Sequence, residues 1–533
     1  MVRAFPNLTT VHFIIVFLAV LLSVARAAER PNILFIMTDD HAAHAMSCYG
    51  SKVNTTPNMD RIAKDGVRFT NAFVTNSICT PSRATILTGK YSHLNGTPVF
   101  NRFDGAQQTV AKLLQAAGYH TGMIGKWHLG SDPTGFDRWI VLPGQGVYRD
   151  PNFVTSAGVV TVNGYATDVI TDLGVEWLET RPKEKPFFLM LHHKAPHRPW
   201  EPDAKNRALF AKRTIPEPPT LFDDYATRPA ALPENAQTIA KDLTRRDLKL
   251  APPTDLTTPE RNKWLNAKPT EVEITMEDGS KNTLTGELLV RWKYQRYMQD
   301  YLACVQGVDD NVGRVLDYLE KTGLAKNTVV FYTSDNGFFL GDNGMFDKRF
   351  MYEPSLRVPL LVRGPGVKAG ATTDLFALNN DFAPTFLELA GLPVPADMQG
   401  RSLAPLLRGE APADWRASMY YRYYHDPGDH NTRAHYGVRT ATHKLIYFWK
   451  KDAWEMFDLA SDPSELRNIA GDAGQAARLA ELKAELARLK KEFKDDDQFG
   501  EEIPPNGVDG VFKDKNALGV KSVPEAVAVT AGK

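Results

Sequence analysis

Cysteine is scarce in this sequence, and its charges cancel. Only Cys48, Cys79 and Cys304 occur among 533 residues. A number so small and odd excludes the dense disulfide framework of small secreted domains. Lysine plus arginine equals aspartate plus glutamate, at 63 each, so the chain has no global field for nucleic acid or an anionic membrane, and we expect neither as a partner. Internal repeats are absent too. Any recognition of an anion must therefore be local.

Long apolar runs are absent as well, except at the N-terminus. Residues 11–24 are almost continuously apolar, which is short for a membrane span of about 20 residues. Arg3 precedes this run, and Ala25-Arg26-Ala27 follows it as an A-x-A cleavage site. The pattern predicts a signal peptide over residues 1–27, cleavage after Ala27, and export to the periplasm or the extracellular space. The alternative is an uncleaved N-terminal anchor; after cleavage we expect no membrane span.

Four short apolar runs each end in a polar cluster. The runs are 32–37, 121–124, 187–191 and 328–333, and the clusters are 38–41, 125–128, 192–197 and 334–337. Unalternating runs are typical of parallel strands buried on both faces, and helical patterns lie between them at 103–118 and 291–320. We therefore predict an α/β domain with a mainly parallel sheet covered by helices. Ligands of such sheets bind beyond the carboxyl ends of the strands, so the four clusters should converge on one site.

Changes in composition predict the domain organisation. The catalytic α/β domain is expected over 28–400, with a Pro-rich and charge-rich insertion at about 201–290 over the sheet edge or the mouth of the site. Strand patterns at 419–424 and 436–448 and a helical leucine stripe at 471–493 predict a smaller C-terminal α+β domain over 401–493. The remainder, 494–533, is a polar tail for which we expect partial disorder.

The most informative segment surrounds Cys79, at 77–89. Its sequence is Ser-Ile-Cys-Thr-Pro-Ser-Arg-Ala-Thr-Ile-Leu-Thr-Gly. Thr80 is placed to cap a helix and Pro81 to begin it, so Cys79 should lie at a helix N-terminus with Arg83 one turn further on. A free cysteine is more often a small buried hydrophobe, but these polar neighbours fit burial poorly. The pattern indicates an anion site built around one sulfur atom.

Two pairs of oxygen ligands follow two of the predicted strands. Asp39 and Asp40 follow the first run, and Asp335 and Asn336 follow the last. An isolated Asp-Asp pair is more often a solvated turn or a helix cap. Two such pairs after buried strands favour a hard cation, Ca²⁺ or Mg²⁺, over zinc.

The segment 77–89 resembles the signature of the sulfatase family, Cys-x-Pro-Ser-Arg followed by Leu-Thr-Gly. The similarity extends through Gly125-Lys126-Trp127-His128, Ala195-Pro196-His197 and the region around Lys348, and it covers about 30–467. It implies an alkaline-phosphatase-like fold and oxidation of Cys79 to Cα-formylglycine (3-oxoalanine) by a formylglycine-generating enzyme. It also implies a Ca²⁺ whose ligands are Asp39, Asp40, the modified Cys79, Asp335 and Asn336.

The resemblance further implies a mechanism for hydrolysis of a sulfate ester. Formylglycine is hydrated to a gem-diol, one hydroxyl of which attacks sulfur, with Asp335 as its base. Arg83, Lys126 and Lys348 hold the sulfonate oxygens, and His197, together with Lys348, protonates the leaving oxygen. His128 then deprotonates the second hydroxyl, and sulfate leaves. His192 and His193 are interpreted as structural.

Two segments, 347–363 and 420–459, are similar to N-acetylglucosamine-6-sulfatases. They imply a sulfated glycan as substrate, with His425 and His435 as candidates for the sugar pocket, although either could be a packing or turn residue. We therefore expect an exported 6-O-sulfatase of N-acetylglucosamine. The alternatives are a sulfatase for another sugar position, a phosphonate or phosphate monoester hydrolase, and a non-catalytic glycan-binding protein if Cys79 stays unmodified. The sequence leaves exo or endo action and the oligomeric state open.

Overall fold

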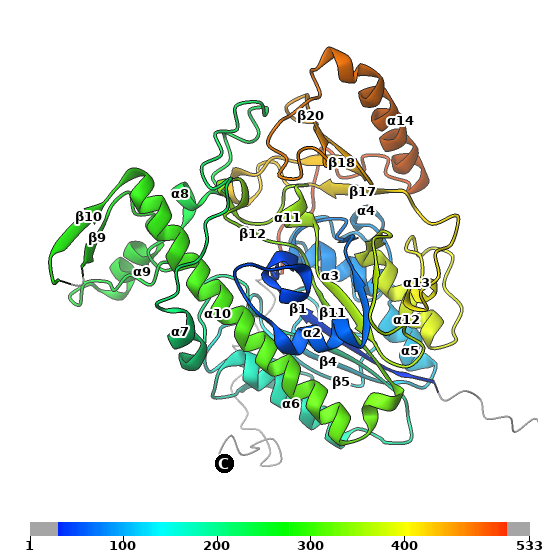
Figure 1. The fold of residues 1–533 in the computed structure, drawn as a ribbon. Helices are drawn as coiled ribbons and strands as arrows, with labels where there is room; N and C mark the ends of the chain where they lie inside the picture. Colours follow the sequence, from blue (N-terminus) through cyan, green and yellow to red (C-terminus); the bar gives the residue numbers. More distant parts are fainter. Residues whose placement is uncertain (1–29, 277, 509–533) are drawn as a thin grey trace, which may run out of the picture.

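A ten-stranded mixed sheet forms the centre of the protein (Figure 1). The computed structural model describes residues 30–276 and 278–508, so the predicted signal peptide lies outside the described residues. The strands follow the order β15-β2-β14-β11-β1-β8-β4-β5-β6-β7. In chain order they are β1 (Asn32–Thr38), β2 (Gly66–Phe69), β4 (His120–Lys126), β5 (Arg138–Leu142), β6 (Asn152–Thr155), β7 (Gly158–Thr161), β8 (Phe187–His192), β11 (Thr328–Ser334), β14 (Leu360–Arg363) and β15 (Ala371–Thr373).

The four predicted apolar runs are the four central strands. β11, β1, β8, β4 and the next strand, β5, run parallel to one another, whereas β11–β14, β5–β6 and β6–β7 are antiparallel pairs. Side chains of β1 alternate between two separate cores: Leu34 and Ile36 enter one, and Ile33 and Phe35 enter the other. A strand covered on both faces must be apolar at every position, which is why these runs do not alternate. The α/β prediction is confirmed.

Helices cover both faces of this sheet. One face carries α2 (Pro57–Lys64), α6 (Ala166–Thr180) and the long α10 (Gly286–Lys321), and the other carries α3 (Cys79–Thr88), α5 (Val110–Ala116) and α12 (Phe382–Leu389). α10 matches the predicted pattern at 291–320. α5 is shorter than the pattern at 103–118, because the side chain of Thr109 caps it by accepting from the Lys112 backbone.

The segment 201–290 folds outside the sheet. It contains α7 (Ala204–Phe210), α8 (Ile239–Asp242), α9 (Thr258–Asn266) and an antiparallel hairpin of β9 (Val272–Thr275) and β10 (Lys281–Leu284). The hairpin projects to one side of the molecule in Figure 1. α7 and α8 pack against α10.

A smaller antiparallel sheet forms the C-terminal part. Its strands are β17 (Ser418–Tyr423), β18 (His435–Thr440), β19 (His443–Phe448) and β20 (Ala453–Asp458), and α14 (Ala476–Glu492) packs on it. Leu482, Leu486 and Leu489 of α14 are buried against Tyr420, Val438 and Leu445 of this sheet. The predicted strands and leucine stripe are therefore confirmed.

Short elements complete the connections between these layers. They are α4 (Ser92–Asn95), α11 (Glu353–Leu356), α13 (Ala404–Leu407), the pair β3 (Ala72–Phe73) and β16 (Ala377–Leu378), and the pair β12 (Phe339–Leu340) and β13 (Phe346–Asp347). Within residues 30–276 and 278–508, no helix combines the length and apolar character that a bilayer crossing requires.

Candidate active site

The four polar clusters meet at the carboxyl ends of the central strands. Asp39 and Asp40 follow β1, and Asp335 follows β11, which pairs with β1 residue by residue up to Thr38 and Ser334. The backbone N–H of Asp40 donates to Asp335 Oδ1 over 3.3 Å. Lys126 ends β4, and the loop after β8 carries His197. Because these strands are parallel neighbours, residues almost 300 positions apart share one site.

Cys79 is the first residue of α3, and its side chain is buried in this site. Its Sγ lies 3.4 Å from Asp39 Oδ1 and 3.3 Å from Lys348 Nζ. The expected cap is wrong: the N-cap is Ile78, with extended backbone and no side-chain cap. Thr80 lies inside the first turn and its hydroxyl donates to the carbonyl oxygen of His128 over 2.8 Å, so it connects the helix to the loop after β4 instead of capping.

The thiol of Cys79 is not set up as a nucleophile. Burial, reinforced by the Asp39 carboxylate, raises its pKa well above the usual range, although Lys348 and Lys126 oppose this. A protonated thiol is a poor nucleophile, since reactivity belongs to the thiolate. The environment therefore suits a derivative of this side chain better than the thiol itself.

Three carboxylates crowd together beside Cys79. Ligand oxygens of Asp39, Asp40 and Asp335 lie within 4.8 Å of one another, and all three residues are buried. Asn336 donates from Nδ2 to Asp40 Oδ1 over 2.6 Å, while its buried Oδ1 has no hydrogen-bond partner among the described residues. An orphaned amide oxygen beside three carboxylates is a donor set that fits a hard cation.

Two lysines compensate this negative charge. Lys126 pairs with Asp39, and Lys348 pairs with Asp40. Burial works to raise the pKa of Asp39, but Lys126, His197 and Arg83 hold it well below its usual range. For Asp40, burial and the neighbouring Asp39 outweigh Lys348 and raise the pKa to about 7. The three carboxylates of the cluster therefore carry more negative charge than the two lysines neutralise.

Arg83 does not reach the open part of the site. Its guanidinium donates from Nε to Asp335 Oδ2 over 2.9 Å, and Nη1 donates to the carbonyl oxygen of Lys126 over 2.6 Å. Nη2 forms an ion pair with the same Asp335 Oδ2 at 2.8 Å. Nη2 also lies 3.5 Å from Asp39 Oδ2. Arg83 is thus a counter-charge that orients the carboxylates from behind and does not line the cavity.

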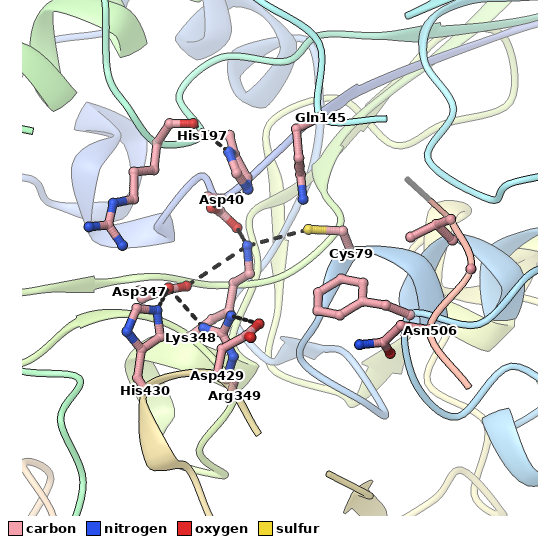
Figure 2. A pocket seen from close by; sticks show the side chains of 14 residues that line it. Asp40, Cys79, Gln145, His197, Asp347, Lys348, Arg349, Asp429, His430 and Asn506 are labelled. Atoms are coloured by element: carbon pink, nitrogen blue, oxygen red, sulfur yellow. Dashed lines mark hydrogen bonds and ion pairs between the residues drawn. The ribbon is translucent and has the colours of Figure 1, made fainter. Parts of the chain in front are cut away.

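A cavity of about 620 Å³ opens in front of Cys79 (Figure 2). Among the predicted site residues, Asp40, Cys79, His197 and Lys348 line it. Its other lining residues are Phe100, Gln145, Arg198, Asp347, Arg349, Asp429, His430 and Asn506–Val508. Lys126 lies behind this surface and donates to Gln145 Oε1 over 2.6 Å. The cavity therefore combines the buried cluster with residues that the sequence did not single out.

The predicted histidines divide by position. His197 donates from Nδ1 to the carbonyl oxygen of Arg198 over 2.7 Å, and its Nε2 faces the cluster, 3.7 Å from Asp40 Oδ2. His128 is buried, with its ring 5.8 Å from the Phe100 ring. His192 is buried and contacts the Lys126 carbonyl oxygen through Nδ1, and His193 is buried as well. Of these four, only His197 lines the cavity.

The two histidines predicted for the sugar pocket lie outside the cavity lining. His425 packs behind Phe100, with ring centroids 5.9 Å apart. His435 accepts at Nε2 from the Met351 backbone over 3.0 Å, and its Nδ1 is 2.8 Å from the Arg433 carbonyl oxygen. With both ring nitrogens held by backbone groups and its ring stacked on Phe350, His435 is a structural residue in this fold. It does not line the cavity in front of Cys79.

Four charged residues that sequence reasoning missed form one wall of the cavity. Arg349 Nη1 lies 2.8 Å from Asp347 Oδ2, and its Nη2 donates to Asp429 Oδ2 over 3.0 Å. His430 Nε2 lies 2.8 Å from Asp347 Oδ2, and these contacts are drawn in Figure 2. All four lie within the two segments that carried the N-acetylglucosamine-6-sulfatase resemblance, beside Lys348 and His425. Their position in these two segments was the sequence signal that could have identified them as candidate site residues.

The segment 201–290 supports this wall from behind. Asp242, the last residue of α8, contacts Nδ1 of His430. Asp247 forms a two-pronged ion pair with the cavity residue Arg198, at 2.8 Å to Nε and 2.5 Å to Nη2. These buried carboxylates hold two cavity side chains in fixed orientations.

Comparison with known proteins places this site in a family. The sulfatase family model matches residues 31–392, which is more than half of the chain and contains Cys79 and the whole carboxylate cluster. The chain belongs to the sulfatase family. A second model, the C-terminal region of N-sulphoglucosamine sulphohydrolase, matches residues 341–492. The sulfatase therefore hydrolyses sulfuric esters, and its large sheet is the alkaline-phosphatase-like sheet of that fold.

Individual relatives cover most of the sulfatase. An N-acetylglucosamine-6-O-sulfatase of Bacteroides thetaiotaomicron is 49% identical over 489 residues, which is 88% of each chain. The N-acetylglucosamine-6-sulfatase of Homo sapiens is 28% identical and covers 84% of this chain and 82% of its own. A solved structure of a protein in complex with its substrate, D-glucosamine-2-N,6-O-disulfate, has a TM-score of 0.83 and 47% identity, and covers 89% of this chain and 100% of that one.

Backbone strain gathers around the site of this sulfatase. Asp40, His128, Asp347, Arg349 and His430 all have positive φ, at 68°, 51°, 72°, 89° and 59°. Non-glycine residues adopt this region rarely, at a cost of the order of 1–3 kcal/mol each. The surrounding contacts must hold these residues in place, as they do for His430 through Asp242 and Asp347. Strain of this kind is typical of functional sites.

His430 connects Asp242 to Asp347 through its two ring nitrogens, and this bridge predicts that the stability of the fold depends on pH. Burial opposes protonation, but Asp242 and Asp347 together raise the pKa of His430 above its usual value. A raised pKa in the folded state adds stability below the unfolded value of about 6.5, and this is lost as pH rises through the folded pKa. We expect His430→Gln to lower the free energy of unfolding by about 1.5–3 kcal/mol at pH 6 and by less at higher pH.

Urea unfolding of both proteins from pH 6 to pH 9 measures this difference. His443→Gln, in β19 and outside the cavity, controls for loss of an imidazole elsewhere. A His430 difference that grows as pH rises would contradict the bridge as described.

Proposed function

We propose that this protein is an exported sulfatase that removes the 6-O-sulfate of N-acetylglucosamine or a related N-substituted glucosamine in a glycan. The observation that carries the proposal is the cavity itself. Cys79, Lys348 and His197 line one side of it, and Lys348 contacts Cys79. The other side is a wall of charged residues that contact one another, among them Arg349 and Asp347. The names of the relatives support the sugar and the sulfate position. The substrate in the similar solved structure, a 6-O-sulfated glucosamine, supports them further.

The carboxylate cluster would hold Ca²⁺ through Asp39, Asp40, Asp335 and Asn336, together with the modified side chain at position 79. When bound, the ion supplies Lewis-acid stabilisation of charge on the reacting oxygens. Arg83 keeps Asp335 and Asp39 oriented for this role through its paired contacts. Formylglycine at position 79, formed by a formylglycine-generating enzyme, supplies a hydroxyl nucleophile that a thiol does not.

The chain's own cations surround the path of the reacting sulfate. Lys348 Nζ lies 3.3 Å from the Cys79 side chain, so it can stabilise the sulfonate oxygens as the bond from sulfur to the sugar oxygen breaks. His197 keeps Nδ1–H on the Arg198 carbonyl oxygen and presents Nε2 toward the same place. In the imidazolium form it can give the Nε2 proton to the departing oxygen and becomes a neutral imidazole. Lys126 is held behind Gln145 and Asp39, and His128 is assigned the later proton transfer that releases sulfate.

The charged wall would bind the sugar. Arg349 and Asp347 offer a donor and an acceptor side by side, and Asp429 and His430 extend the same surface. Adjacent hydroxyl groups of a pyranose present both hydrogens and lone pairs, so a paired cation and carboxylate matches them. Export is supported by the N-terminal pattern Arg3, the apolar run 11–24 and Ala25-Arg26-Ala27.

A panel of substrates tests the proposed function. We expect matured protein to cleave N-acetylglucosamine 6-sulfate far faster than its 3-sulfate or galactose 6-sulfate, and an aryl sulfate faster than an aryl phosphate or phosphonate. Released sulfate or phosphate is measured by ion chromatography. A preference for another sulfate position would refute the proposed substrate. A preference for the phosphorus esters would refute the proposed reaction class.

Arg349→Ala tests the charged wall in the same assay. Loss of charged hydrogen bonds of about 1.5–3 kcal/mol predicts a fall in kcat/KM for the sugar sulfate of about 10- to 100-fold. Arg478→Ala, on the exposed side of α14 and paired with Glu481 one turn away, is the matched control and should retain the wild-type value. An Arg349→Ala protein with unchanged kcat/KM would remove this wall from substrate recognition.

A further inference from the structure

The chain returns to the cavity after its last helix. Residues 494–508, which we call the C-terminal strap, leave α14, and Asn506, Gly507 and Val508 line the cavity. The backbone N–H groups of Gly507 and Val508 donate to the carbonyl oxygen of Phe100 over 2.9 and 3.2 Å. A segment predicted as a polar tail therefore forms part of the wall in front of Cys79.

Both ends of the strap are anchored. At its start, Asp495 is buried and accepts from Arg422 Nη1 over 2.6 Å and from the Tyr420 hydroxyl over 2.5 Å. Arg422 is itself buried, with its guanidinium stacked on the Trp449 ring at 4.7 Å. Buried charged pairs with this many partners hold a segment in one conformation.

At its far end, the strap packs against the loop that follows β4. Val508 is 1% exposed, and a Cβ atom added at Gly130 would lie 3.0 Å from Val508 Cα. Gly130 also has a positive φ of 68°, so glycine suits both the turn and the close approach of the strap. The strap is thus fitted to the same loop that carries Lys126 and His128.

Asn506 is the polar group that this wall offers to a ligand. Its side chain is exposed and makes no hydrogen bond within the described part of the chain. In Figure 2 it lies across the cavity from Asp347 and His430, and Phe100 lines the same cavity. The two sides of the cavity therefore differ in chemistry: one is charged, and the other combines an aromatic ring, a valine and a free amide.

We propose that the C-terminal strap is a specificity-determining wall and that Asn506 hydrogen-bonds the substituent on the sugar nitrogen, an inference that rests on the proposed function. With the 6-sulfate held at Cys79, the charged wall matches adjacent hydroxyls, whereas an N-acetyl group needs an amide partner and an apolar surface. Asn506 supplies the first, and the half-buried ring of Phe100 supplies the second. In ligand sites, a small number of polar groups within an apolar wall typically fixes the orientation of the ligand.

Two variants of the full-length protein test this wall. Asn506→Ala removes the amide, and a chain ending at Gln498 removes the wall but keeps Asp495 and Asp497 on Arg422. The readout is the ratio of kcat/KM for N-acetylglucosamine 6-sulfate to that for glucose 6-sulfate, which has no nitrogen substituent. We expect Asn506→Ala to lower this ratio about 3- to 10-fold, and the truncation to lower it further. Glu502→Ala, exposed on the same strap, is the matched control.

The outcomes separate the two proposals. If wild-type protein cleaves both 6-sulfates and the ratio is unchanged in both folded variants, the strap proposal is overturned and the proposed function stands. If wild-type protein prefers another sulfate position, the proposed substrate fails, and the same ratio is measured with the N-acetylated and hydroxyl forms of that sugar. Wild-type protein that cleaves no sulfated sugar overturns both. Thermal melts show whether the truncated chain is folded, and Asn506→Ala decides the question if it is not.

Discussion

Cys79→Ala is expected to abolish turnover, with kcat falling by at least about four orders of magnitude. Cys79 lies where the carboxylate cluster, Lys348 and the cavity meet, and alanine provides neither a thiol nor the aldehyde derived from one. The fold should survive because the change removes one atom from a side chain at the edge of an existing cavity. Initial rates on the preferred sulfate ester, together with a thermal melt, measure both effects.

The control for this substitution is Cys48→Ala. Cys48 is half-buried and lies outside the cavity, so this variant should keep wild-type turnover. Peptide mass spectrometry over residues 76–90 shows whether wild-type Cys79 has become the aldehyde. A Cys79→Ala protein that still cleaves sulfate esters would refute the nucleophile assignment, and a native protein whose Cys79 stays a thiol would refute catalysis through formylglycine and favour the non-catalytic glycan-binding alternative.

Removal of the metal should have the second-largest effect. Exhaustive chelation is expected to suppress turnover, because Asp39, Asp40 and Asp335 then remain crowded together with Lys126, Lys348 and Arg83 as their nearest counter-charges. Stability should fall too: an ion that binds only the folded state adds about 2.7 kcal/mol at 100 times its Kd. Adding Ca²⁺ back should therefore raise the melting temperature as well as restore activity.

The variant Asn336→Ala tests the ligand set directly. The buried Oδ1 of Asn336 has no partner in the described structure and would become a ligand of the ion. We expect this variant to need a higher Ca²⁺ concentration for the same rise in melting temperature. Asn262→Ala, on the exposed helix α9, should respond as wild-type protein does. Full activity and an unchanged melting temperature after chelation would remove the metal from the mechanism.

Local sequence patterns were sufficient to predict which residues meet at the reactive end of the site. The unalternating apolar runs identified β1, β4, β8 and β11, because a strand covered on both faces has no polar position. Parallel strands then place their carboxyl ends at one edge, so Asp39, Lys126, His197 and Asp335 were predicted to converge without knowledge of the intervening loops. The segment around Cys79 carried its own signal in its residue pattern.

The same reasoning failed where a side chain's partner is distant in sequence. Thr80 has the residue type of a helix cap, but its hydroxyl contacts the His128 carbonyl oxygen. His435 has the residue type of a ligand-binding group, but both of its nitrogens are held by backbone atoms. Residue type states what a side chain can bind, whereas the fold decides which partner is within reach.

The sequence by itself determined which groups meet at the reactive end of the cavity: Cys79, the carboxylates and the amide that follow two strands, and the cations beside them. Each of these was readable because it stands next to a strongly patterned strand or in a dense motif. Only the tertiary structure decided the outer part of the cavity, since it brings His430 of the C-terminal part and Asn506 of the strap to one cavity and places Asp242 of the segment 201–290 behind His430. These segments lack hydrophobic periodicity, and their positions follow from long-range packing and ion pairs that no local pattern encodes.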